Sequence, residues 1–200
     1  MSIFRKKRYI ETDEPLNASK SSENREHILN NIFQWFLVVL SGAILGYAMI
    51  TFLFQTVTVI GPSMNPTLAD GDIVIVNKLE YNISDIDRYD VVAYSLIEED
   101  GYFDIKRIIG LPGETVVIKE GYVYINGKQL QNQPFHEKII TSGIASDTII
   151  LGDGEYFVLG DNVNNSEDSR YTNVGNISEV EIIGKVSYII KSDNKKGKVH

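Results

Sequence analysis

The residues best suited to covalent chemistry are a serine in a turn and a lysine in an apolar segment. Ser63 lies among Gly61, Pro62 and Pro66, residue types that set the direction of the backbone rather than fill a core. Lys106 lies inside a strongly apolar segment, where an unpaired ammonium is costly and a neutral amine is favoured. Because a neutral amine can take the proton of a serine hydroxyl, the two residues predict a nucleophile and its general base.

Simpler interpretations compete with this one. A serine between prolines is commonly only a turn residue, and a lysine on an edge strand commonly extends its ammonium into solvent. A histidine could serve as the base instead, but His27, His136 and His200 lie in no predicted strand or motif. The sequence around Ser63 also lacks the Gly-x-Ser-x-Gly turn of the α/β-hydrolases. We therefore favour a lysine base.

Composition narrows the class of protein. The chain has 200 residues, of which 43% are hydrophobic, so we expect one globular domain and an additional segment. It contains no cysteine, which excludes disulfides and thiolate zinc sites. Residues 56–200 contain 13 Lys and Arg against 22 Asp and Glu. This negative balance argues against nucleic acid or an anionic lipid surface as the main partner of the globular part.

The additional segment is a predicted membrane anchor. Residues 35–54 carry no charge, and a helix of that length spans ~30 Å, the hydrocarbon thickness of a bilayer. A cleaved signal peptide would have a shorter apolar region nearer the N-terminus, and a buried core helix is rarely so uniformly apolar. We therefore predict a transmembrane helix over residues 32–54.

Charge around this helix predicts its orientation. The basic cluster of residues 5–8 precedes the helix, and positive residues favour the cytoplasmic side. We expect residues 1–31 to form a flexible cytoplasmic tail and residues 55–190 to form an extracytoplasmic domain. Only nine residues lead from Phe54 to Ser63, which is ~30 Å even when fully extended. Ser63 is therefore expected to act near the membrane surface.

The domain is predicted to be β throughout, because short alternating or apolar runs are separated by turn residues. We expect single strands at residues 56–60, 71–78, 89–94, 102–109 and 181–190. We also expect two hairpins, one joining residues 115–119 to 122–125 and one joining 148–151 to 155–159. Residues 131–147 are polar and irregular, and residues 191–200 form a basic tail.

Four motifs follow the anchor in a fixed order. They are Gly-Pro-Ser-Met-Asn-Pro-Thr-Leu at 61–68, Gly-Asp-Ile-Val-Ile-Val-Asn-Lys at 71–78, Lys-Arg-Ile-Ile-Gly-Leu-Pro-Gly-Glu at 106–114, and Gly-Asp-Asn-Val-Asn-Asn-Ser-Glu-Asp-Ser-Arg at 160–170. In this combination the chain closely resembles the bacterial type I signal peptidases over residues 33–190. The resemblance implies a membrane-anchored, mainly β catalytic domain with a smaller β insertion at roughly 115–157. It also implies cleavage of exported preproteins after small residues at the −1 and −3 positions, without a metal or cofactor.

The resemblance also implies roles for single residues. Ser63 matches the nucleophile, and its backbone N–H matches a donor to the oxyanion. Lys106 matches the general base. Some family members have a second oxyanion donor, a serine two residues before the nucleophile, but this chain has Gly61 there.

The last motif matches residues that support the site. Ser166 matches a serine that hydrogen-bonds the lysine amine and orients it. Asp161, Asp168 and Arg170 match residues that hold the site through ion pairs, and we expect Arg107 to be the partner of Asp161.

One departure from the family pattern concerns the base. Asp104 lies two residues before Lys106, where the family usually has an aromatic residue. The spacing predicts that both side chains lie on the same face of a strand. A carboxylate there would favour the ammonium form of the lysine and oppose its role as a base.

The sequence is also compatible with other functions. The chain could be a dedicated peptidase for one secreted or pilus-type substrate, or a catalytically silent, anchored β domain that binds exported chains. A self-cleaving repressor also uses serine and lysine, but it requires a DNA-binding segment where this chain has its anchor. The expected partners are exported preproteins, whose chains would lie extended along a strand, and membrane lipid around the helix.

Overall fold

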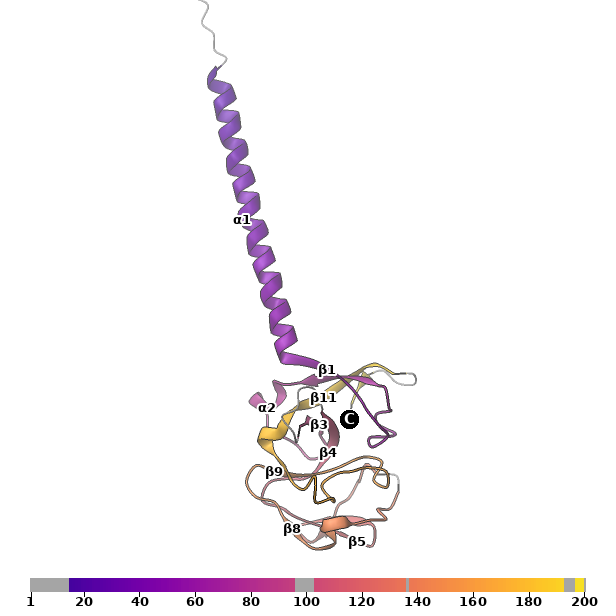
Figure 1. The fold of residues 1–200 in the computed structure, drawn as a ribbon. Helices are drawn as coiled ribbons and strands as arrows, with labels where there is room; N and C mark the ends of the chain where they lie inside the picture. Colours follow the sequence, from indigo (N-terminus) through magenta and orange to yellow (C-terminus); the bar gives the residue numbers. More distant parts are fainter. Residues whose placement is uncertain (1–14, 96–102, 136, 193–196, 200) are drawn as a thin grey trace, which may run out of the picture. The chain divides into compact units, whose positions relative to one another are not determined.

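The computed structural model describes residues 15–95, 103–135, 137–192 and 197–199. The chain divides into two units, residues 1–50 and residues 51–200, which are described separately. Figure 1 traces both, with the N-terminal unit in indigo and purple.

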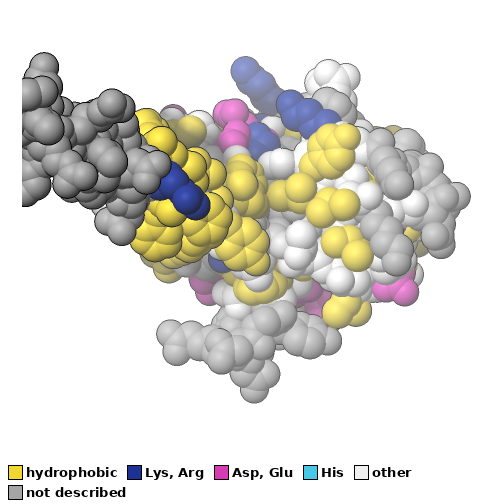
Figure 2. Space-filling view, turned by 90° about the horizontal axis from the view of Figure 1, so that it is seen from above, with side chains coloured by type: hydrophobic (Ala, Val, Ile, Leu, Met, Phe, Trp, Pro, Cys, Tyr) yellow, Lys and Arg dark blue, Asp and Glu magenta, His cyan; other side chains and the backbone are white. Residues whose placement is uncertain are grey.

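The described part of the N-terminal unit is helical throughout. Helix α1 (Pro15–Leu53) has 39 residues, and its portion His27–Leu53 is long and apolar enough to cross a membrane. Hydrophobic side chains gather on the described part of the helix in the view of Figure 2, and none of this apolar portion is buried within the protein. The expectation of a flexible tail over residues 1–31 is wrong for residues 15–31, which are helical. Pro15 suits a first helical position, no proline follows it within α1, and each further residue adds a hydrogen bond to an existing helix. Residues 1–14 lie outside the described part.

The second unit is mainly β, as predicted, and its larger sheet is antiparallel throughout the described strands. The strand order is β1-β2-β11-β3-β4-β9-β10, and β12 pairs with β11. The strands are β1 (Phe54–Thr58), β2 (Ile73–Asn77), β3 (Val91–Tyr94), β4 (Asp104–Gly110), β9 (Glu155–Leu159), β10 (Ile177–Ser178), β11 (Ile182–Lys191) and β12 (Gly197–Lys198). Short helices α2 (Glu80–Ile83) and η2 (Glu179–Glu181) lie between them in sequence.

A smaller sheet falls within the range predicted for an insertion. Its order is β7-β6-β5-β8, with β5 (Thr115–Lys119), β6 (Tyr122–Ile125), β7 (Lys128–Gln129) and β8 (Ile149–Ile150). The 3₁₀ helix η1 (Gly143–Ser146) precedes β8. The hairpin β5–β6 has the predicted bounds, and Glu120 and Gly121 take positive φ angles of 52° and 83°, as a tight hairpin turn requires.

The second predicted hairpin is wrong. β8 pairs with β5 in the small sheet, whereas β9 pairs with β4 and β10 in the large sheet. Residues 152–154 do form a turn, but the strands on either side of it enter different sheets. The chain thus leaves the small sheet between β8 and β9.

One segment near the C-terminus also departs from expectation. Part of the predicted basic tail forms β12, whose Lys198 lies opposite Tyr188 of β11. Residues 193–196 and 200 of that tail lie outside the described part. A strand of two residues has too little pattern to be predicted, so the pairing depends on the neighbouring strand.

β4 is central because both of its faces are buried. Ile105 packs in a cluster with residues of β1, β2 and β11, and Ile109 packs in a cluster with the small sheet. Ile108, on the opposite face, packs in a third cluster with β3 and β9. This packing fixes the strand that carries the lysine.

Candidate active site

The loop that carries Ser63 is closed at its base by hydrogen bonds between its two ends. The Val59 N–H donates to the Asp72 carbonyl at 2.8 Å, at the start of β2. Met64 and Leu68 are fully buried, so the loop is also anchored to the core from inside. Apolar side chains on both sides of a turn thereby hold Ser63 in place.

Gly61 shapes the approach to Ser63. It has a φ angle of +81°, in the region that favours glycine, and its N–H donates to Asp70 Oδ1 at 2.7 Å. This amide is therefore engaged within the loop, and Gly61 has no side chain that could replace the serine hydroxyl of other family patterns. Gly61 therefore supplies no second hydrogen-bond donor to the oxyanion.

Lys106 approaches Ser63 from β4. Its register partner on β3 is Val92, and the residue is 3% exposed. Lys106 Nζ lies 3.3 Å from Ser63 Oγ. β9 pairs with β4 only from Arg107 onward, so the edge of β4 beside Lys106 faces the segment that follows β9. The predicted serine and lysine are thus in contact.

Asp104 lies on the same face as Lys106, as the spacing predicts. Asp104 Oδ1 is 3.6 Å from Lys106 Nζ, and the Asp104 side chain is 58% exposed. Opposite Asp104 on β3 is Tyr94, which is fully buried and whose hydroxyl has no hydrogen-bond partner among the described residues. Burial, and then the negative charge of Asp104, raise the pKa of the Tyr94 phenol. The phenol therefore stays protonated.

Arg107 and Asp161 form the expected ion pair. Arg107 Nε and Nη2 donate to the two Asp161 oxygens at 2.7 and 2.6 Å, with side chains 3% and 1% exposed. Arg107 also donates to the Tyr89 carbonyl at 2.7 Å and, at 3.4 Å, to the hydroxyl of Thr67 in the Ser63 loop. The pair therefore joins β4, the nucleophile loop and the segment that follows β9.

Asp168 and Arg170 form the second expected pair. Arg170 Nε and Nη2 donate to Asp168 at 2.7 and 2.9 Å, and both residues are buried. Asp168 Oδ2 also accepts the Gly160 N–H at 3.1 Å. Arg170 donates to the Thr141 carbonyl at 3.0 Å, so the pair fixes the 160–170 segment against the connection between β7 and η1.

Asn162 is a further residue that holds the Ser63 loop, and it was not among the predicted site residues. Its N–H donates to the Ser63 carbonyl at 2.9 Å and its Nδ2 to the Pro62 carbonyl at 3.2 Å. A side chain on neighbouring Gly160 would overlap both Ser166 and the Ser63 carbonyl oxygen. The only sequence signal was that Asn162 lies within the fourth motif, which does not reveal its partner.

Ser166 lies near the site but does not make the expected contact. Its hydroxyl is buried and has no hydrogen-bond partner among the described residues, so the predicted bond to the Lys106 amine is not formed. The amine lies instead between Ser63 and the Asp104 carboxylate. A carboxylate attracts an ammonium more strongly than a neutral hydroxyl does, which accounts for the difference.

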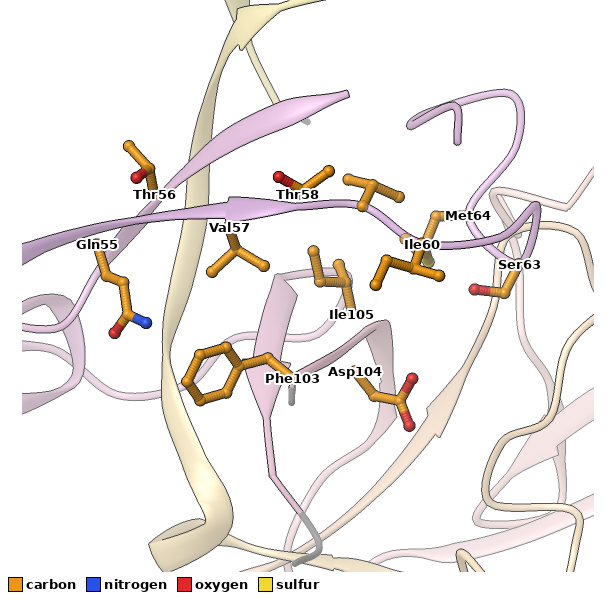
Figure 3. Close-up of a pocket in the computed structure, with 11 residues that line it drawn as sticks. Gln55, Thr56, Val57, Thr58, Ile60, Ser63, Met64, Phe103, Asp104 and Ile105 are labelled. Carbon is orange, nitrogen blue, oxygen red and sulfur yellow. The ribbon is translucent and has the colours of Figure 1, made fainter. Parts of the chain in front are cut away.

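A cleft leads to Ser63 (Figure 3). It has a volume of about 350 Å³, and one wall comes from β1 and the residues after it while the other comes from the start of β4. Among the described strands, β1 is an edge strand of the large sheet. Its outer edge can therefore offer backbone N–H and C=O groups to an extended peptide. The lining residues are Gln55, Thr56, Val57, Thr58, Val59, Ile60, Ser63, Met64, Phe103, Asp104 and Ile105.

The arrangement suits acyl transfer by a serine. A hydroxyl and an amine in contact, at the end of a mostly apolar cleft, provide a nucleophile and a base. His27 lies in α1, and His136 and His200 lie outside the described residues. The described residues include no cluster of three acidic or histidine side chains that could hold a metal ion.

Comparison with known proteins gives a consistent assignment. A family model described as signal peptidase, peptidase S26, matches residues 32–191. Signal peptidase I from Bacillus caldolyticus is 34% identical over 165 residues, covering 77% of this chain and 86% of that protein. Signal peptidase I V from Bacillus subtilis (strain 168) is 37% identical over 165 residues, covering 76% and 95%.

A solved structure is also similar. The crystal structure of a signal peptidase I from Enterococcus faecalis V583 has 31% sequence identity and a TM-score of 0.43, and the match covers 52% of this chain and 99% of that chain. The extent of the family match and the identity to full-length relatives decide the assignment: the chain belongs to the signal peptidase family, peptidase S26.

Proposed function

We propose that this protein is a membrane-anchored endopeptidase that removes signal peptides from exported preproteins, with Ser63 as nucleophile and Lys106 as general base. The observation that carries the proposal is the 3.3 Å contact between Lys106 Nζ and Ser63 Oγ, made by a lysine that is only 3% exposed. Because a buried amine is poorly hydrated, its neutral form is less disfavoured than it would be in water.

The reaction divides into two steps. Neutral Lys106 takes the proton from Ser63 Oγ as this oxygen attacks the peptide carbonyl carbon, and the Ser63 N–H stabilises the oxyanion. The Lys106 ammonium then gives its proton to the departing amine, which leaves an ester on Ser63. In the second step Lys106 takes a proton from water and the resulting hydroxide attacks the ester carbon. The bond to Ser63 Oγ then breaks, the Lys106 ammonium returns its proton to Ser63 Oγ, and the acyl group leaves as a free acid.

The 160–170 segment acts as support for this pair. Asn162 holds the Ser63 carbonyl, and the two buried ion pairs hold the segment that carries Asn162. Ser166 is proposed to bind the Lys106 amine once substrate has entered, because catalytic hydrogen bonds often form only in the substrate complex. Each of these residues acts by positioning Ser63 or Lys106.

The cleft supports a preference for small residues. Its walls carry the apolar side chains of Val57, Ile60 and Ile105. An extended substrate would present alternate side chains to these walls. A bulky residue there would need the walls to move, which costs more than a small residue does.

The proposed topology places residues 1–31 in the cytoplasm and residues 55–190 outside the membrane, with α1 crossing between them. It is supported by the basic cluster before the apolar part of α1. The small sheet would form the insertion of the catalytic domain.

Cleavage of a preprotein tests the proposal. The full-length protein in non-ionic detergent should release the signal peptide from a preprotein with Ala at −3 and −1, and the new N-terminus should begin at +1. Replacing the −1 Ala by Phe or Lys should abolish this product. Efficient cleavage after Phe or Lys would reject the proposed specificity. No cleavage of the parent preprotein would reject the proposed activity.

A further inference from the structure

An exposed carboxylate lies beside the reacting groups. Asp104 lies at the Ser63 end of the cleft, while Phe103 and Gln55 lie toward the other end (Figure 3). Asp104 also lines an adjoining hollow that is formed with Ile60, Ser63, Lys106, Glu167, Asn173 and Val174. A peptide bound at Ser63 must therefore pass this carboxylate.

The charges around Asp104 do not balance when the base is active. Lys106 is the only cationic residue among the described residues that line the cleft and the hollow. Once Lys106 is neutral, Asp104 and Glu167 remain as two carboxylates with no cation beside them in the described lining. Glu167 accepts a hydrogen bond from the Asn173 amide, which is uncharged.

Two further carboxylates near the site are already paired with arginines. Asp161 is bound by Arg107, and Asp168 is bound by Arg170, both in buried pairs. Tyr94 faces Asp104 from β3, and its raised pKa keeps the phenol neutral. The Asp104 carboxylate is thus the exposed charge in direct contact with the base.

We propose that Asp104 is a specificity-determining residue that binds a basic side chain of the substrate at −2, +1 or +2. This inference rests on the proposed peptidase activity. In the free protein the partner of Asp104 is the Lys106 ammonium, 3.6 Å away. In the complex the substrate cation replaces it, Lys106 releases one proton to solvent, and the neutral amine can then accept the Ser63 proton. The charge of the Asp104 pair stays balanced throughout.

The physical basis is the sign of the nearby charges. An ionised Asp104 favours the ammonium form of Lys106, which cannot act as a base. A basic substrate side chain offsets that effect, while an acidic one adds to it. Because the Asp104 side chain is 58% exposed, solvent screens the pair, and we expect a modest effect of roughly twofold to fivefold in kcat/KM.

The test uses one preprotein with neutral residues at −2, +1 and +2. Lys and, as a neutral match, Gln are placed at each of these positions in turn, and kcat/KM is measured at low salt. The full-length protein is used in non-ionic detergent, so that no lipid charge attracts the substrate. We expect Lys to exceed Gln at one position by about the stated factor, and the difference to shrink in high salt.

Three variants show which carboxylate causes the preference for Lys over Gln. Asp104→Asn keeps the side-chain shape and should remove the preference. Glu167→Gln tests the other carboxylate of the hollow and should keep it. Asp153→Asn, on an exposed turn between β8 and β9, makes the same change in net charge and should also keep it.

The acidic side of the pH profile gives a second readout. In the parent protein the activity on the Lys substrate should begin at lower pH than the activity on its Gln match, because the substrate cation releases Lys106. In Asp104→Asn the two profiles should coincide.

The outcomes separate this inference from the proposed function. If the neutral preprotein is not cleaved at all, the peptidase proposal itself fails. If it is cleaved but Lys and Gln are equivalent at all three positions in the parent protein, only the role of Asp104 is rejected. A preference that survives in Asp104→Asn and disappears in Glu167→Gln would also reject it.

Discussion

The buried pair of Asp168 and Arg170 gives the sharpest prediction for stability. Asp168 is 0% exposed and Arg170 is 2% exposed, so the substitution Asp168→Asn leaves a guanidinium in the interior without its counter-charge. The two bonds from Arg170 at 2.7 and 2.9 Å are weakened, while those to backbone carbonyls remain. Removing one partner of a buried ion pair lowers the free energy of unfolding by ~3–5 kcal/mol. Because Arg170 keeps its bonds to backbone carbonyls, we expect a loss at the lower end of this range.

The expected loss is large enough to measure. For a domain of this size, ~3 kcal/mol corresponds to a fall in Tm of roughly 6–12 °C. Calorimetry on the full-length protein in non-ionic detergent measures it. The matched control is Glu80→Gln, an acid-to-amide change in the Lys185–Glu80 pair, which is 3.9 Å long with side chains 28% and 34% exposed. This control should cost no more than about 1 kcal/mol.

Activity should fall together with stability in Asp168→Asn. Asp168 also accepts the Gly160 N–H, and the segment that begins at Gly160 carries Asn162, which holds the Ser63 carbonyl. If Asp168→Asn unfolds at the same temperature as the parent and the Glu80→Gln control, the pair contributes no net stability and this role for the segment is wrong.

Three further predictions concern the base, its neighbour and the topology. Asp104→Asn should move the acidic limb of the pH–activity profile for a neutral substrate to lower pH, because removing the negative charge favours the neutral amine; an unmoved limb would mean that Asp104 does not act on the base. Ser166→Ala should lower kcat while changing the free energy of unfolding by about 1 kcal/mol or less, since the hydroxyl makes no hydrogen bond among the described residues; unchanged kcat would remove Ser166 from the mechanism. Protease added outside intact spheroplasts should digest residues after Gln55 and leave the N-terminal segment intact, and protection of the β domain would reverse the proposed topology.

Local sequence patterns predicted the elements whose partners are also local. The β5–β6 hairpin was predicted with its observed bounds because its turn residues and its pairing lie within the same short stretch. The same reasoning failed for β8 and β9, where a genuine turn separates two strands that pair with distant ones. Pairing between distant strands depends on packing and leaves little trace in a short stretch of sequence.

The candidate site divides in the same way. The spacing of Asp104 and Lys106 placed them on one strand face, and the structure confirms that placement. The contacts of Asn162 with the Ser63 loop join residues about 100 positions apart, as in the bond to the Pro62 carbonyl. Such a contact becomes visible only once the fold brings the segment after β9 against the loop.

The most direct measurement for the central claim is the rate of preprotein cleavage by matched variants of the two reacting residues. Ser63→Ala removes the nucleophile, and Lys106→Met removes the amine while keeping an unbranched side chain to fill the buried space. Both variants should unfold like the parent and should lose activity by at least about 10³-fold. Cleavage by Lys106→Met within tenfold of the parent rate, at about the same pH, would contradict the assignment of Lys106 as the base.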